Sequence, residues 1–157
     1  MVFRAAFYKG TRPGLPGVYN RVVRWWTRSK HSHMELIFSD GLSASSSFED
    51  GGVRFKRINY SSDNWDFREL PQWMEAPARR YFEDRKGWRY DLLGQLHFII
   101  SPIRGAVRKL FCSAAGLGAL MIEESYRYSP GEAYFILGCP AFTERQPTIV
   151  NFDFSKP

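Results

Sequence analysis

The sequence predicts an α+β domain in which an antiparallel β-sheet meander packs against helices. Two turn signals, Asp40-Gly41 and Asp50-Gly51-Gly52, separate three short strand-like segments and favour tight hairpins between them. In other parts of the chain, apolar residues recur at the spacing of a helix. The length of 157 residues fits one domain over 1–157, and we see no linker or internal repeat that would divide it.

The N-terminal part of the sequence predicts a short strand over 2–8 and then an amphipathic helix. The helix is inferred because apolar residues recur at helical spacing while arginines lie mostly on the other side. The apolar residues are Val18, Val22, Trp25 and Trp26, and the arginines are Arg21, Arg24 and Arg28.

The three strands of the meander are expected at 34–38, 42–48 and 53–58. If the first hairpin has a two-residue turn, Leu36 lies opposite Ser45. One face of this sheet is expected to be solvated, because charged and apolar residues alternate approximately along the third strand.

The rest of the chain is expected to mix loops, helices and one further strand. In order, we expect a polar loop over 60–72, a helix over 73–84, a buried helix over 90–100, a helix that begins near Cys112, a turn at 129–132 and a strand over 134–137.

The composition limits the class of protein. A net charge of +6 and an isoelectric point near 9.5 favour a polyanionic neighbour, such as nucleic acid, anionic lipid or a bacterial envelope. The two cysteines, Cys112 and Cys139, are too few for a disulfide scaffold and have the wrong pattern for a zinc ribbon. We therefore expect no metal and no cofactor. No segment has the length of a membrane span and the N-terminus has no signal-peptide pattern, so we expect synthesis in the cytoplasm.

The stretch from Lys109 to Met121 is the first candidate for chemistry. Its small and apolar residues predict a buried helix packed closely on a sheet, with Cys112 in the first turn. Unpaired backbone N–H groups and the positive end of the helix dipole favour a thiolate there, which is the reactive form of cysteine. The competing interpretation is that Cys112 is only a small buried hydrophobic residue.

A cysteine nucleophile needs a histidine, and the chain has three. His97 lies within an apolar helical pattern, which is typical of a core residue. His31 and His33 precede the first meander strand, and His33 leads directly into it, so it is the more rigidly placed. Strand alternation puts Glu35 on the same face as His33. The polar group that orients the imidazole is expected on the next strand, as Ser45 or alternatively Ser46, Ser47 or Glu49.

Four short segments carry a family resemblance, namely 32–41, 50–55, 90–94 and 111–113. In this order, with a histidine strand before a cysteine helix, they resemble the circularly permuted papain-like branch of the NlpC/P60 superfamily. That branch includes YiiX-like proteins and small phage-encoded proteins. The resemblance implies a permuted papain-like fold over the whole domain, with a Cys112 nucleophile, a His33 base and a polar third residue.

The function implied by these residues is that of a thiol hydrolase, a cysteine peptidase or amidase that cleaves an amide or ester bond. We expect Tyr90, Trp26 and Ser113 to bind the substrate. Peptides of peptidoglycan are the expected substrate, and an acyl-lipid hydrolase or acyltransferase would use the same chemistry. The resemblance also suggests a phage-encoded protein that is delivered to the cell envelope, and the sequence leaves open whether the protein leaves the cytoplasm.

Two other classes of function remain open on the sequence. A non-catalytic binding module on the same fold would recognise its partner through an aromatic and basic surface. Nucleic-acid binding is the weaker alternative, because only the net charge and the arginines beside Trp25 and Trp26 favour it.

Overall fold

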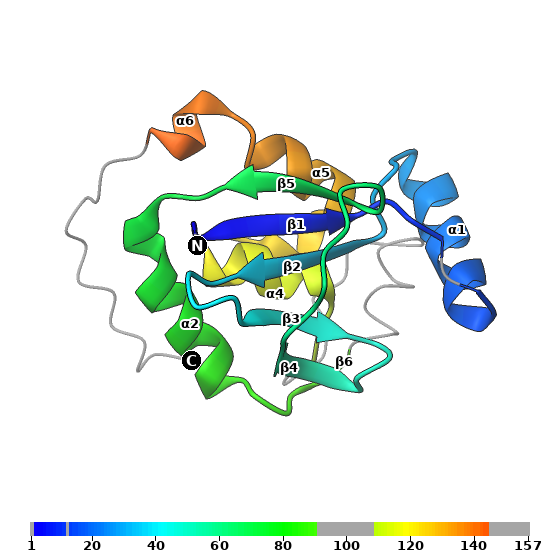
Figure 1. The fold of residues 1–157 in the computed structure, drawn as a ribbon, viewed down its shortest axis with the longest axis horizontal. Helices are drawn as coiled ribbons and strands as arrows, with labels where there is room; N and C mark the ends of the chain where they lie inside the picture. The colour runs from blue at the N-terminus through cyan, green and yellow to red at the C-terminus, as the bar shows by residue number, and fades with distance from the viewer. Residues whose placement is uncertain (1, 12, 91–108, 145–157) are drawn as a thin grey trace.

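A computed structural model describes residues 2–11, 13–90 and 109–144, and in these ranges the chain forms one curved sheet with helices packed on it (Figure 1). The α+β class is confirmed. Within the described ranges the sheet has seven strands in the order β5-β1-β2-β3-β4-β6-β7, antiparallel except for the last pair. The strands are β1 (Arg4–Tyr8), β2 (His33–Ile37), β3 (Ser43–Ser47), β4 (Gly52–Lys56), β5 (Trp65–Glu69), β6 (Arg89–Tyr90) and β7 (Lys109–Leu110).

The helices differ in how they meet the sheet. They are α1 (Leu15–Thr27), η1 (Gln72–Met74), α2 (Glu75–Asp84), α4 (Cys112–Ala119), η2 (Ser125–Arg127), α5 (Pro130–Ile136) and α6 (Pro140–Thr143). α4 and α5 lie behind the sheet in Figure 1, and α4 packs against β2 and β3. α1 lies at one end of the molecule. None of the helices in the described ranges combines the length and the apolar character that crossing a bilayer requires.

The core follows from the alternation of side chains along the strands. Phe7 of β1 and Met34 and Leu36 of β2 face Leu117 of α4 in the larger apolar cluster, and all four are fully buried. The intervening residues of the same strands, such as Ala6 and Ile37, pack with Trp65 on the other face. Both faces of the central strands are therefore covered.

The first hairpin differs from the expected register by one residue. Leu36 pairs with Ala44, not with Ser45. The loop has three residues instead of two, because the Gly41 N–H donates to the carbonyl of Phe38 and Gly41 adopts a left-handed φ of 79°. A one-residue slip exchanges the two faces of β3, so the positions of its serines relative to β2 change.

Two elements were predicted wrongly. The polar segment expected as a loop contains β5, which pairs antiparallel with β1 at the edge of the sheet. The strand expected over 134–137 instead forms the end of α5 and its C-cap residue Leu137, and the first turn of α5 is closed by a capping box between Ser129 and Glu132. Of the buried helix expected over 90–100, Tyr90 ends β6 and the remainder lies outside the described residues.

Candidate functional site

His33 and Cys112 come together although they are far apart in the sequence. His33 is the first residue of β2, Cys112 is the first residue of α4, and the imidazole lies within hydrogen-bonding reach of the Cys112 sulfur. The His33 side chain is 16% exposed, whereas Cys112 is only 1% exposed. The sulfur is therefore covered, and the imidazole is the part of the pair that reaches solvent.

Two contacts place the start of α4 against β2 and β3. Gly116 lets α4 approach the strand closely, because a Cβ atom there would lie only 2.7 Å from the Cε atom of Met34. The Oγ atom of Ser46 donates a 2.5 Å hydrogen bond to the carbonyl of Leu110, which ties β3 to the residue two positions before Cys112. The small residues of α4 thus serve the close approach that the sequence suggested.

The second partner of His33 is Glu35. The Nε2 atom of His33 lies 2.7 Å from the Oε1 atom of Glu35, whose side chain is 1% exposed. The two residues share a face of β2 because side chains alternate along a strand. With Nε2 engaged by the carboxylate, Nδ1 is the nitrogen that remains for the sulfur of Cys112.

Arg54 of β4 holds the Glu35 carboxylate. Its Nη1 and Nη2 atoms donate hydrogen bonds of 2.7 and 2.6 Å to the two carboxylate oxygens, which is the bidentate geometry that guanidinium favours. Its Nε atom donates a 2.8 Å hydrogen bond to Asp50, and Asp50 also accepts from Lys56 at 2.9 Å. A continuous chain of polar contacts therefore runs from Cys112 through His33 and Glu35 to the turn before β4.

The electrostatics of the site favour a protonated imidazole. Burial alone would lower the pKa of His33, but the Cys112 sulfur and the Glu35 carboxylate outweigh it and raise the pKa to about 9. Burial would likewise raise the pKa of Glu35, yet the hydrogen bonds from Arg54 and His33 keep it below its ordinary value. The arrangement can hold an imidazolium between the Cys112 sulfur and the Glu35 carboxylate.

The expectation that Ser45 orients the imidazole is corrected to Glu35. The Ser45 hydroxyl donates a 2.6 Å hydrogen bond to the carbonyl of Met34, and the Ser46 hydroxyl donates to the carbonyl of Leu110. Ser47 is buried at the last position of β3, and Glu49 lies exposed in the turn that follows. The signal that identifies Glu35 was present in the sequence as the same-face spacing of His33 and Glu35.

The three expected substrate-binding residues have different outcomes. The side chain of Ser113 is wrong as a substrate contact, because it is fully buried and its hydroxyl donates a 2.7 Å hydrogen bond to the carbonyl of Tyr128. Tyr90 is partly exposed and pairs with Leu110 across β6 and β7, so it stays a prediction close to the site. The side chain of Trp26 and the whole of His97 lie outside the described residues.

The start of α4 offers backbone donors beside the sulfur. The N-cap residue Phe111 is extended, with φ −101° and ψ 169°, and its side chain makes no capping hydrogen bond. The first N–H groups of a helix have no acceptor within the helix. The amides at Cys112 and Ser113 are therefore suited to hold an oxyanion that develops next to the sulfur.

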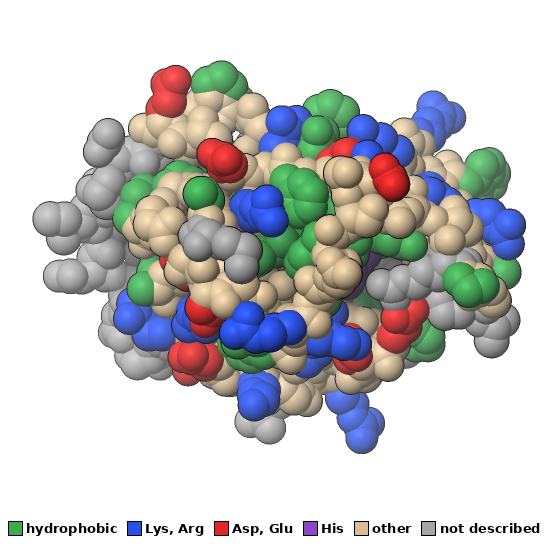
Figure 2. All heavy atoms as spheres, in the orientation of Figure 1, with side chains coloured by type: hydrophobic (Ala, Val, Ile, Leu, Met, Phe, Trp, Pro, Cys, Tyr) green, Lys and Arg blue, Asp and Glu red, His purple; other side chains and the backbone are tan. Residues whose placement is uncertain are grey.

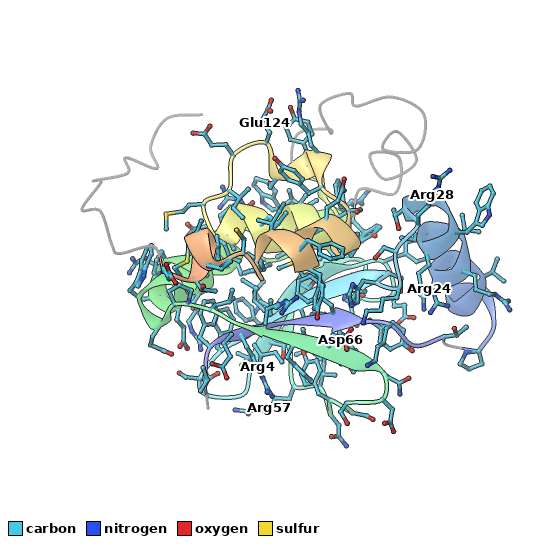
Figure 3. All side chains as sticks on the ribbon, turned by 90° about the horizontal axis from the view of Figure 1, so that it is seen from above. Arg4, Arg24, Arg28, Arg57, Asp66 and Glu124 are labelled. Atoms are coloured by element: carbon cyan, nitrogen blue, oxygen red, sulfur yellow. The ribbon has the colours of Figure 1, made fainter. Side chains whose placement is uncertain are left out.

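His31 interacts with Asp66 and Tyr134 and not with Cys112. Its Nε2 atom lies 2.9 Å from Asp66, and its ring centroid lies 4.4 Å from that of Tyr134. Burial lowers the pKa of His31 and outweighs the opposing effect of Asp66. Asp66 also pairs with Lys9 and Lys30, at 2.8 and 2.7 Å (Figure 3 labels Asp66). His31 thus belongs to a separate ionic cluster, and His33 is the histidine of the cysteine site.

The described part of the chain holds no group of three or more His, Cys, Asp or Glu side chains arranged to bind a metal ion. Comparison of the whole chain with protein-family models, with curated proteins and with solved structures finds no match in any of the three.

Proposed function

We propose that this protein is a cysteine hydrolase that cleaves an amide or ester bond. Cys112 is the nucleophile, His33 is the general acid and base, and Glu35 is a positioning residue that orients His33. The observation that carries the proposal is that one imidazole contacts both the Cys112 sulfur and a buried carboxylate. A thiol, an imidazole and a group that orients the ring are the parts that thiol acyl transfer requires.

The steps follow from the positions of these groups. The Cys112 thiolate attacks the carbonyl carbon of the substrate, and the electron pair of the carbonyl moves to its oxygen. The tetrahedral intermediate collapses, the His33 imidazolium gives its proton to the leaving amine or alcohol, and a thioester forms on Cys112. The now neutral His33 takes a proton from water, which attacks the thioester and releases the acid. The thiolate and the imidazolium are then restored.

The oxyanion is the charge that the protein must stabilise along this path. The amides at the start of α4, which no N-cap side chain binds, support a role as its donors, because they belong to the same helical turn as Cys112. Loss of one such donor in other hydrolases costs about 2.7–4 kcal/mol of transition-state stabilisation.

The permuted papain-like fold and its substrate belong to the same proposal. In support, a strand that carries the histidine precedes in sequence the helix that begins with the cysteine, and that helix packs on the sheet. The resemblance then suggests peptidoglycan peptides as substrates, and a basic chain is suited to an anionic envelope. Acyl-lipids and protein amides would be cleaved by the same steps.

Alkylation by iodoacetamide tests the Cys112–His33 pair directly. Cys139 is exposed and would also react, so Cys112 is measured in a Cys139→Ser background and Cys139 in a Cys112→Ser background. Burial of Cys112 slows its alkylation at every pH, whereas the ion pair changes how the rate depends on pH. For each cysteine we take the ratio of its alkylation rate at pH 6 to its alkylation rate at pH 9. We expect this ratio to be much larger for Cys112 than for Cys139. His33→Ala should remove this difference.

Hydrolysis of p-nitrophenyl acetate gives the second readout. The wild type should release p-nitrophenolate with a burst followed by slower turnover, and Cys112→Ser should show neither above the background rate. Identical pH dependence for Cys112 and Cys139, or an unchanged Cys112 profile in His33→Ala, would rule out the ion pair and with it the proposed mechanism.

A further inference from the structure

α1 presents three large apolar residues to solvent on one side. Val18, Val22 and Trp25 are 48%, 47% and 75% exposed. They are spaced by four and then three residues, so they form a single stripe along the helix. Asn20 and Val23, each 6% exposed, lie on the opposite side and attach α1 to the rest of the protein. The stripe therefore faces outward.

Arginines lie along one edge of this stripe. Arg21 and Arg28 are exposed, and Arg28 points away from the body of the molecule in Figure 3. Arg24 donates hydrogen bonds to the carbonyl of Lys9 and the hydroxyl of Thr11, which are neutral acceptors, so its charge is not cancelled. In Figure 2, Lys and Arg side chains and hydrophobic side chains mix at this end of the molecule.

The charge around α1 is unusually one-sided for a surface helix. The first acidic residue of the chain is Glu35, so no carboxylate occurs in α1 or before it. The nearby Asp66 is already paired with Lys9 and Lys30. The net charge of +6 is thus concentrated in the segment that contains α1, since basic and acidic residues nearly balance after it.

We propose that α1 binds the surface of an anionic lipid membrane. The stripe formed by Val18, Val22 and Trp25 enters the boundary between headgroups and acyl chains, and Arg21 and Arg28 contact the lipid phosphates. A helix with an outward apolar face, a basic edge and an aromatic residue lies in the plane of the interface and does not cross the bilayer. With 13 residues, α1 is also too short to span one.

The valines favour lipid over nucleic acid as the occupant. A nucleic-acid surface would use the arginines and could stack a base on Trp25, but it gains nothing from exposed aliphatic side chains. A second copy of this chain would bring two basic helices together and be repelled. A lipid interface satisfies both features, because the acyl region accepts the valines and the phosphates accept the arginines.

The test is flotation of the purified full chain with vesicles. One set contains equal parts of phosphatidylcholine and phosphatidylglycerol, and the other contains phosphatidylcholine alone. We expect the wild type to float with the anionic vesicles and to remain largely unbound with the neutral ones. Binding should weaken as salt is raised, since the arginine contacts are screened.

Single variants separate the apolar and the charged contributions. Val22→Asp should weaken binding to anionic vesicles by about tenfold or more. The substitution removes a valine side chain that would enter the membrane, and it adds a negative charge that the lipid phosphates repel. Arg21→Gln and Arg28→Gln should each weaken it by about fivefold and reduce the salt dependence. Phe135→Asp and Arg127→Gln are matched controls at exposed sites on other elements, and they should bind like the wild type.

The outcomes decide between the possible occupants. Failure of the wild type to bind anionic vesicles, equal binding to both vesicle types, or wild-type binding by Val22→Asp would each overturn the proposal. If the protein binds a single-stranded oligonucleotide tightly and does not bind vesicles, nucleic acid is the ligand of α1 instead. Cys112→Ser should bind vesicles like the wild type, so this test stands or fails independently of the hydrolase proposal.

Discussion

The Nε2 atom of His33 lies 2.7 Å from the Oε1 atom of Glu35, two residues further along the same strand. Because Glu35 is buried and held by Arg54, its position is fixed, and so is the plane of the imidazole that it binds. Against the effect of burial, Cys112 and then Glu35 raise the pKa of His33 to about 9. Each of the first three predictions concerns one link of this polar chain.

Replacing Glu35 by Gln removes the carboxylate while keeping the shape of the side chain. The pKa of His33, raised to about 9 in the wild type by Cys112 and Glu35 against burial, should fall by about one unit or more. NMR titration of the His33 ring measures this directly. Ser45→Ala is the matched control, because the Ser45 hydroxyl binds the carbonyl of Met34. An equal shift in both variants would mean that the carboxylate does not hold the proton on His33.

Replacing Arg54 by Met leaves Glu35 buried with its main cationic partner gone. We expect the free energy of unfolding to fall by about 3 kcal/mol, as for other broken buried pairs. Removing both charges in Glu35→Gln/Arg54→Met should be less destabilising than Arg54→Met alone, since no unpaired carboxylate remains. Urea unfolding followed by far-ultraviolet circular dichroism gives the values. Arg127→Met, which removes an exposed pair with Glu124, should leave the unfolding midpoint nearly unchanged.

Asp50, at the end of this polar chain, makes the stability of the folded protein depend on pH. Burial would raise the pKa of Asp50, but hydrogen bonds from Arg54 and Lys56 lower it from 3.8 to about 2. A depressed pKa stabilises the folded state above pH 3.8, and this contribution is lost as the pH falls towards 2. Its size is on the order of 1 kcal/mol for a partly exposed pair. Asp50→Asn should therefore differ from the wild type in unfolding free energy at pH 5 but approach it near pH 2.

Sequence patterns with a local cause predicted their elements well. The turn glycines placed β2, β3 and β4 within one or two residues, and the small residues after Cys112 placed α4. Cys112 and His33 could be paired in advance because each stands at the start of its element. These features depend on turn chemistry and on close packing, which a short stretch of sequence records.

The elements that were missed depend on contacts with distant parts of the chain. β5 is polar and short, and it becomes a strand only because β1 offers an open edge, with Phe67 opposite Ala6. α5 was missed for another reason. The aromatic residues Tyr134 and Phe135 suggested a strand, but the capping box that starts at Ser129 stabilises a helix there. The register of the first hairpin depended on one residue of loop length, which Asp40-Gly41 alone does not specify.

Two neighbouring glycines before Arg54 provide the last prediction. Gly51 has φ 80° with no atom within 4 Å of a would-be Cβ, so Gly51→Ala should cost only about 1 kcal/mol of backbone strain. At Gly52, φ is 151° and a Cβ would overlap the carbonyl oxygen of Trp88, which accepts the Val53 N–H across β4 and β6. Because that oxygen belongs to the backbone, Gly52→Ala should cost about 3 kcal/mol or more. Urea unfolding of both variants measures the difference. Equal losses of unfolding free energy would show that β6 moves away from β4 at little energetic cost. If β4 instead shifts in Gly52→Ala, Arg54 moves with it, and the pKa of His33 should change in the same variant.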